Sequence, residues 1–145
     1  MVINTNKIML DKPIIISDLI VYEDADLLVL NKPAGLIINQ AETHQQISLQ
    51  DLVAAYLHFD QLQFEPVAQN LLPADFAPQY GTPLDIWQER RCMVHRLDKD
   101  TSGLTVWAKN PLALVNLLSQ FRQRQVSKTY LCLVHGFFSS DQQSG

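Results

Sequence analysis

The order of apolar and polar positions divides this chain into short elements. Two apolar runs at 27–30 and 36–38 flank the sequence Asn-Lys-Pro-Ala-Gly at 31–35. Short apolar runs separated by proline and glycine are typical of strands joined by a turn. Residues 19–39 therefore predict a β-hairpin with its turn at 31–35.

Two segments carry the start signals of helices. Ser48 is followed three residues later by Asp51, which is a capping-box pattern, and the apolar stripe behind it predicts a helix to about His58. Asn110 and Pro111 suit the N-cap and the first turn of a second helix. The core face that we expect for this helix consists of Leu114, Leu117, Leu118 and Phe121, and Arg122 and Arg124 close it.

Two further runs predict strands. Residues 104–108 form a compact apolar run, and residues 128–134 alternate so that Tyr130, Cys132 and Val134 share one face. Residues 1–18 are interpreted as an N-terminal lead-in, and residues 19–145 as one structural unit.

Residues 61–89 break the periodic pattern. Four prolines and Gly81 interrupt it, while Phe64, Phe76, Tyr80 and Trp87 supply apolar anchors. We therefore expect a long ordered loop. Its aromatic side chains either pin it to the body of the domain or stack on bases of a nucleic acid.

Composition and cysteine usage limit the function classes. The chain has 145 residues, of which 47% are hydrophobic and 18% charged, as in an ordinary globular domain. No apolar run reaches the length of a membrane span, and the N-terminus lacks a secretion signal, so we expect a cytoplasmic protein with no membrane partner. Cys92 and Cys132 are expected to be buried reduced thiols, and the four histidines lack metal-ligand spacing, which predicts no metal.

Charge is distributed unevenly along the chain. Residues 1–89 carry three lysines against twelve acids, whereas residues 90–130 carry eight Lys/Arg against Asp98 and Asp100. A basic block around two acids fits either an RNA-facing site or a solvated face. The block consists of Arg90, Arg91, Arg96, Lys99, Lys109, Arg122, Arg124 and Lys128.

The segment 94–104, with the sequence Val-His-Arg-Leu-Asp-Lys-Asp-Thr-Ser-Gly-Leu, carries the candidate chemistry. It begins like a calcium-binding EF-hand loop, but Lys109 stands where that loop needs a carboxylate. A kinase catalytic loop also fails, because Leu97 separates His-Arg from Asp and no Asp-Phe-Gly follows. A glycosidase pair made of Asp98 and Asp100 is a weak alternative, since adjacent turn residues rarely straddle a sugar.

The motif His-Arg-Leu-Asp-x-x-Thr-Ser-Gly-Leu, intact from His95 to Leu104, resembles the signature of the RluA-type RNA pseudouridine synthases. Other matches occur in the order found in that family. They are the run at 21–26, Asn31-Lys32-Pro33-x-Gly35, Ala108-Lys109-Asn110, Phe121, Arg124, Val126, Lys128, Tyr130 and Gly136. The resemblance implies an α+β fold with a mixed, mostly antiparallel sheet flanked by helices, and the predicted order of elements agrees with it.

The resemblance also implies a cofactor-free reaction on uridine in ribosomal or transfer RNA. The bond between N1 and ribose C1′ breaks, the uracil turns, and C5 joins C1′. Asp98 matches the essential aspartate, which acts either as nucleophile or as the base that removes the ribose 2′ proton. Both roles need an ionised carboxylate beside the sugar. The target base must also leave the RNA stack before it can react.

Further roles follow from the same resemblance. Arg96 matches the residue that enters the RNA as the base leaves, and Tyr130 matches the tyrosine that packs on the uracil. His95 and Lys128 complete the expected substrate and RNA-binding set. A structural role in shaping the motif loops is expected for Lys32, Pro33, Thr101, Ser102 and Gly103.

The chain departs from the family pattern near its C-terminus. It lacks a Gly-Arg-x-His-Gln-Ile-Arg segment, whose first arginine is the expected partner of the catalytic aspartate. The resemblance therefore implies that residues 19–145 are the N-terminal portion of the catalytic domain, and we expect a truncated gene product that is inactive alone. An apolar sheet edge near residues 128–134 is expected to favour self-association. A non-catalytic RNA-binding fragment is the alternative function.

Overall fold

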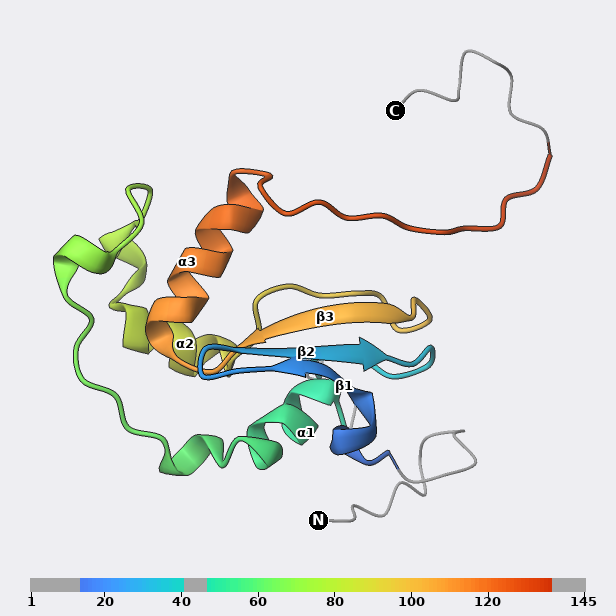
Figure 1. The fold of residues 1–145 in the computed structure, drawn as a ribbon, viewed down its shortest axis with the longest axis horizontal. Coiled ribbons are helices and arrows are strands. Elements are labelled where there is room, and N and C mark those ends of the chain that lie inside the picture. Colours follow the sequence, from blue (N-terminus) through green and yellow to red (C-terminus); the bar gives the residue numbers. More distant parts are fainter. Residues whose placement is uncertain (1–13, 41–46, 137–145) are drawn as a thin grey trace.

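A computed structural model describes residues 14–40 and 47–136 of the chain (Figure 1). Within these ranges the chain forms one three-stranded antiparallel sheet and three α-helices, which confirms the α+β class. The strands are β1 (Ile20–Glu23), β2 (Leu27–Lys32) and β3 (Gly103–Ala108). The helices are α1 (Leu49–Tyr56), α2 (Pro83–Arg90) and α3 (Pro111–Arg122), and four short 3₁₀ helices are η1 (Ile16–Leu19), η2 (Phe59–Gln61), η3 (Gln69–Leu71) and η4 (Pro78–Tyr80).

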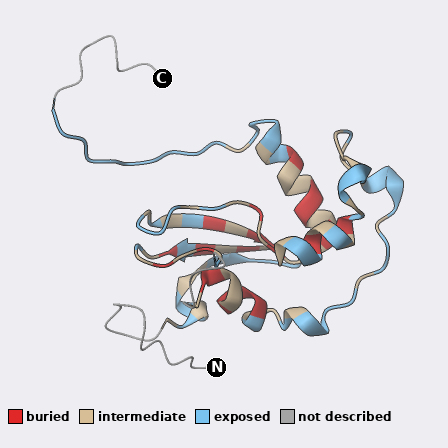
Figure 2. Cartoon of the chain, turned by 180° about the vertical axis from the view of Figure 1, so that it is seen from behind, coloured by how far each residue is buried: buried red, intermediate tan, exposed pale blue. Residues whose placement is uncertain are grey.

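β2 is the central strand of the sheet and carries its apolar core. It pairs with β1 on one side and β3 on the other, with Leu28 opposite Trp107 and Leu30 opposite Thr105. Leu28, Leu30 and Trp107 are all fully buried, because alternate residues of a strand face the same side. Figure 2 shows that buried residues gather on the sheet and on the helices around it.

The predicted hairpin is shifted along the sequence. Its turn lies at residues 24–26, where Asp24 Oδ1 accepts hydrogen bonds from the backbone N–H of Asp26 (2.8 Å) and Leu27 (2.7 Å). The prediction of a turn at 31–35 and a strand at 36–38 was therefore wrong. Residues 36–38 instead form a buried loop, and the carbonyl groups of Ile37 and Ile38 accept the N–H groups of the first two residues of α1. Helix starts need such acceptors, and the loop supplies them.

Both predicted helices are confirmed, together with their caps. Ser48 and Asp51 form the reciprocal capping box of α1, and Asn110 Oδ1 accepts the N–H of Ala113 at 2.8 Å at the start of α3. On α3, Leu114 is fully buried, while the other three predicted core residues are partly buried against the core. Local side-chain signals thus placed both helix starts correctly.

The predicted loop at 61–89 contains a helix that the sequence analysis missed. α2 begins after Thr82, which forms a capping box with Asp85, and Pro83 occupies its first turn. Gly81 and Pro83 were interpreted as helix breakers, although proline fits the first turn of a helix. The buried Trp87 of α2 donates its indole N–H to the Ala108 carbonyl at 3.0 Å.

Two aromatic and two polar contacts tie residues 59–82 to the body of the domain. Phe59 stacks on Trp87 at 4.5 Å between ring centroids, and the edge of Phe64 meets the same ring at 4.9 Å. Asp75 accepts a hydrogen bond from Ser119 at 2.6 Å and forms an ion pair with Arg122 on α3. The segment runs around the outer side of α2 and α3 (Figure 1). The anchoring role of Phe64 and Trp87 is confirmed by their contact, whereas Tyr80, which was also expected to anchor the loop, is exposed.

The final strand predicted at 128–134 does not form. These residues are extended and exposed (Figure 2), and the side chains of Leu131 and Leu133 are fully exposed. An alternating sequence becomes a strand only when another strand pairs with it, and no other described segment does so. Self-association through this segment stays a prediction. Cys132 is exposed as well, so the expected buried thiol holds only for Cys92, where burial raises the pKa to about 12.

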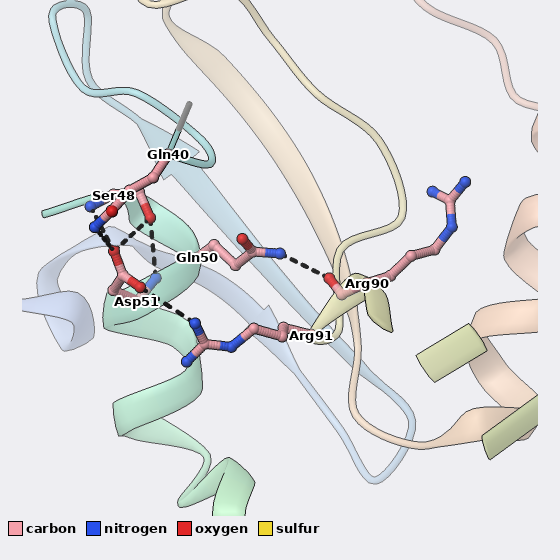
Figure 3. A network of polar contacts seen from close by, with 6 residues as sticks. All are labelled: Gln40, Ser48, Gln50, Asp51, Arg90 and Arg91. Carbon is pink, nitrogen blue, oxygen red and sulfur yellow. Dashed lines mark hydrogen bonds and ion pairs between the residues drawn. The ribbon is translucent and has the colours of Figure 1, made fainter. Parts of the chain in front are cut away.

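One carboxylate joins the start of α1 to the segment that follows α2 (Figure 3). Asp51 Oδ2 accepts hydrogen bonds from Ser48 N–H (3.0 Å), Ser48 Oγ (2.7 Å) and Gln40 Nε2 (3.0 Å), and Oδ1 lies 3.4 Å from Arg91 Nη1. Burial by itself would raise the pKa of Asp51, but these donors outweigh burial and leave it lowered. Gln50 adds a second link, because its amide donates to the Arg90 carbonyl at 2.7 Å.

We expect Asp51→Ala to lower the free energy of unfolding by about 2–3 kcal/mol, because it removes a helix cap and two longer-range links. The matched control is Asp85→Ala, which removes the same type of capping box on α2 without such links and should cost about 1 kcal/mol. Urea unfolding at neutral pH measures both. Equal losses would show that the contacts to Gln40 and Arg91 add nothing to stability.

Candidate functional site

A buried lysine organises the loops at one end of the sheet. Lys32, the last residue of β2, is 0% exposed, and its ammonium group donates to the carbonyl oxygens of Pro33 (3.1 Å), Leu36 (2.8 Å) and Lys99 (2.8 Å). Burial lowers the pKa of Lys32, while the nearby charges of Asp100 and Asp98 act in the opposite direction. The expected structural role of Lys32 near the motif is thus supported by its contacts.

Backbone hydrogen bonds hold the C-terminal half of the motif loop, which comprises residues 94–102. Gly35 N–H donates to the Lys99 carbonyl at 2.9 Å, so this carbonyl serves both Gly35 and Lys32. Thr101 N–H donates to the Asp98 carbonyl at 3.1 Å. Gly103 has φ +130°, a conformation that strongly favours glycine, which accounts for glycine at the start of β3. The expected side-chain bonds of Thr101 and Ser102 do not occur among the described residues.

His95 joins the motif loop to β3 and α3. Its Nε2 accepts the backbone N–H of Val106 at 3.0 Å, and its ring stacks on Phe121 at 4.8 Å between centroids. Because Nε2 is an acceptor, the neutral ring carries its proton on Nδ1. Burial and the charge of Lys128 lower the pKa of His95, which favours this neutral form.

Arg96 and Asp98 line one pocket of about 540 Å³ between the motif loop and residues 37–39. Both are exposed, whereas His95, which precedes Arg96, and Leu97, which lies between Arg96 and Asp98, are half-buried. The alternation agrees with the expectation that Arg96 and Asp98 project from the same side. The other lining residues are Ile37, Ile38, Asn39, Leu97 and Lys99.

Six of the remaining predicted site residues line a separate, neighbouring pocket, whereas Lys32 and Pro33 line neither pocket. His95, Lys128 and Tyr130 surround a space of about 680 Å³ together with Thr101, Ser102 and Gly103. Lys128 Nζ lies 5.7 Å from the centre of the Phe121 ring, a cation–π contact. The predicted site residues that line a pocket are therefore divided between two pockets, and Leu97 lines both of them.

The basic block is partly neutralised by internal ion pairs. Arg91 pairs with Asp51, Lys109 with Glu23 at 2.8 Å, and Arg122 with Asp75 at 3.0 Å. In the part of the chain that the structure describes, the other basic residues of the block form no ion pair. They are Arg90, Arg96, Lys99, Arg124 and Lys128, and Arg96 and Lys99 flank Asp98 in sequence.

Within residues 14–40 and 47–136, no group of three His, Cys, Asp or Glu side chains is arranged to hold a metal ion. No helix in the same ranges combines the length and apolar character needed to cross a membrane.

Comparison with known proteins identifies the motif. Residues 87–144 match the family model described as RNA pseudouridylate synthase. Ribosomal large subunit pseudouridine synthase D of Pseudomonas aeruginosa is 36% identical over 121 residues, which are 83% of this chain and 30% of that protein. The chain belongs to the RNA pseudouridine synthase family.

Other pseudouridine synthases align over a similar span. The same-named enzyme of Borreliella burgdorferi is 32% identical over 83% of this chain and 31% of its own length. The uncharacterized RNA pseudouridine synthase YlyB of Bacillus subtilis is 34% identical over 84% and 33%. The chain thus spans about a third of the length of these relatives. The solved structure of human RNA Pseudouridylate Synthase Domain Containing 4 aligns with this chain with a TM-score of 0.46 and 24% sequence identity. The alignment covers 76% of this chain and 31% of the human chain.

The pocket wall at 37–39 is the part of the candidate site that the sequence analysis missed. Its residues were assigned to a strand, because an apolar run beside a glycine reads as one. The signal that could have placed them is the capped helix start at Ser48, whose free N–H groups need nearby acceptors.

We expect the stability of the protein to fall as the pH drops below about 6.5, because His95 takes up a proton more readily in the unfolded chain. The stability that His95 contributes is fully present above the pKa of this residue in the unfolded chain. It is lost as the pH falls toward the lower pKa of His95 in the folded protein. Urea midpoints at about pH 7.5 and 5.5 measure it. His95→Gln, which cannot titrate in this range, should flatten the difference, whereas His135→Gln at an exposed position should leave it unchanged. An equal pH difference in His95→Gln would contradict the assignment.

Proposed function

We propose that the protein carrying this chain isomerises uridine to pseudouridine in structured RNA, with Asp98 as its catalytic carboxylate. The observation that supports this most directly is the pocket shared by Arg96 and Asp98, beside the loop that the buried Lys32 holds in place. Large-subunit ribosomal RNA is the first substrate class to test, because relatives in Pseudomonas aeruginosa and Borreliella burgdorferi carry that substrate in their names. Transfer RNA is the second.

The chemistry of the reaction fits an exposed carboxylate in a polar pocket. The N1–C1′ bond breaks and the C5–C1′ bond forms, so the hydrogen at C5 leaves as a proton and N1 gains one. Asp98 acts either as nucleophile or as the base at the ribose 2′ position. No change of oxidation state occurs, so the reaction needs no redox cofactor.

Arg96 and the second pocket have distinct parts in this proposal. A uridine inside a helical stem exposes neither C1′ nor C5, so it must be extruded at a cost of about a few kcal/mol. Arg96, exposed beside Asp98, would occupy the place that the base leaves. Tyr130 offers an aromatic face on which an unstacked base can pack, and Lys128 offers a charge for the phosphate backbone.

We expect Asp98→Asn in the full-length protein to lower pseudouridine formation by at least about a thousandfold, because the amide is neither a base nor a nucleophile. Release of tritium from RNA labelled at uridine C5 measures the reaction directly. The matched control is Asp100→Asn, which changes a carboxylate of the same loop that lines the other pocket and should retain most activity. Full activity in Asp98→Asn would overturn the proposal.

RNA binding without turnover is a second candidate for the 145-residue chain by itself. The observation that favours it is the group of five basic residues that form no ion pair within the described ranges, two of which flank Asp98 in sequence. Such residues bind phosphates and release counterions, so the affinity would depend strongly on salt.

We expect Lys128→Ala to weaken RNA binding and to reduce the slope of log K against log salt by about 1, as for loss of one phosphate contact. Lys109→Ala is the control, because Lys109 is already paired with Glu23 at 2.8 Å. Fluorescence anisotropy with unmodified large-subunit ribosomal RNA fragments over a salt series gives both slopes. Equal slopes in the two variants would remove Lys128 from the RNA interface.

A further inference from the structure

The wall of the Asp98 pocket at residues 37–39 and its two neighbours, Leu36 and Gln40, are hydrogen-bonded to their surroundings at every position except one. The carbonyl of Leu36 accepts from Lys32 Nζ, and the carbonyls of Ile37 and Ile38 each accept a backbone N–H of α1 at 2.8 Å. The side chain of Gln40 donates to Asp51 at 3.0 Å, as Figure 3 shows. The exception is Asn39, which lies between two anchored neighbours.

Asn39 faces the candidate chemistry. It is half-buried and lines the pocket together with Arg96 and Asp98. None of the side-chain hydrogen bonds among the described residues involves its amide, in contrast to Gln40 and Gln50 nearby. An amide carries one acceptor oxygen and two donor hydrogens. A polar group that lines a pocket and has no hydrogen-bond partner among the described residues is suited to bind a ligand in that pocket.

We propose that Asn39 is a substrate-contacting residue that hydrogen-bonds the target nucleotide beside Asp98. This inference rests on the proposed function and extends it to a residue outside the recognised motif. A flipped uracil loses its pairing partner and presents N3–H as donor between two carbonyl acceptors. The amide of Asn39 can accept from N3–H and donate to a neighbouring carbonyl. A carboxylate at this position would lack the donor, and an alkyl side chain would lack both groups.

Because the pocket wall is anchored, the proposed hydrogen bond from Asn39 to the target nucleotide would also contribute to substrate selectivity. A hydrogen-bonding group that is held in place discriminates against ligands that leave it unpaired. The bonds from Lys32 and α1 fix the backbone on the N-terminal side of Asn39, and the bond from Gln40 fixes it on the other side. Asn39 therefore lies between two anchored segments, and Lys32, which bonds to the first of them, also bonds to the motif loop.

The test uses the full-length protein and in vitro transcribed, unmodified large-subunit ribosomal RNA. For Asn39→Ala we expect KM to rise about tenfold, the loss of one or two hydrogen bonds to substrate, with kcat changed less than about threefold. Asn70→Ala, the same change at an exposed residue of η3, should leave both constants unchanged. If Asn39→Ala does not fold, Asn39→Ser replaces it. An unchanged KM in a folded variant overturns the inference.

Two further measurements separate this inference from the proposed function. In the Asp98→Asn background, binding of the same RNA by anisotropy should be about tenfold weaker when Asn39→Ala is added, a result that does not depend on turnover. The second measurement is pseudouridine formation by Asp98→Asn itself, which tests the proposed function without any change at Asn39. If Asp98→Asn loses activity but the addition of Asn39→Ala leaves RNA binding unchanged, the inference about Asn39 is wrong and the proposed function stands. Full activity in Asp98→Asn sinks the proposed function.

Discussion

The geometry of the candidate site depends on one buried ammonium group. A lysine that is taken out of water is costly unless its hydrogens find acceptors, because a charged group without partners in the interior is strongly disfavoured. Lys32 has three donor hydrogens and meets three carbonyl groups, two from the loop after β2 and one from the motif loop. Lys32 and Lys99 are 67 residues apart in sequence, and the hydrogen bond between them joins the two loops. Asp98 and the wall that faces it are therefore parts of one hydrogen-bonded unit.

The strands predicted at 27–30 and 104–108 are confirmed as β2 and β3, and the helix starts that sequence alone predicted correctly have a local cause. The starts of α1 and α3 follow from Ser48, Asp51 and Asn110, whose side chains bond to backbone a few residues away. The same kind of capping signal was present for α2 at Thr82 and Asp85, but the prolines around it were interpreted as signals of a loop. Strand assignments at 36–38 and 128–134 failed because a strand depends on a distant partner. An apolar or alternating run does not show whether that partner is present.

For the site, the motif located Arg96 and Asp98 on one side of an extended loop, and their common pocket agrees with that. The sequence contained no sign that Lys32 would bond to backbone carbonyls, because every residue offers the same carbonyl group. It also gave no sign that His95 accepts a hydrogen bond from Val106. This contact makes His95 part of the scaffold of the loop, while its expected contact with RNA stays a prediction. Contacts between side chain and backbone over long sequence distances decide such roles.

The segment between α1 and α2 has a different relation to the rest of the molecule. It is held by aromatic packing of Phe64 on Trp87 and by the bonds of Asp75 to α3, and the chain between these two anchor points is largely exposed. The free energy of closing a loop grows only with the logarithm of its length. Residues could thus be gained or lost between the anchors at little cost, and the pocket of Asp98 would not sense the change. The fold confines its freedom to vary in length to a place remote from the chemistry.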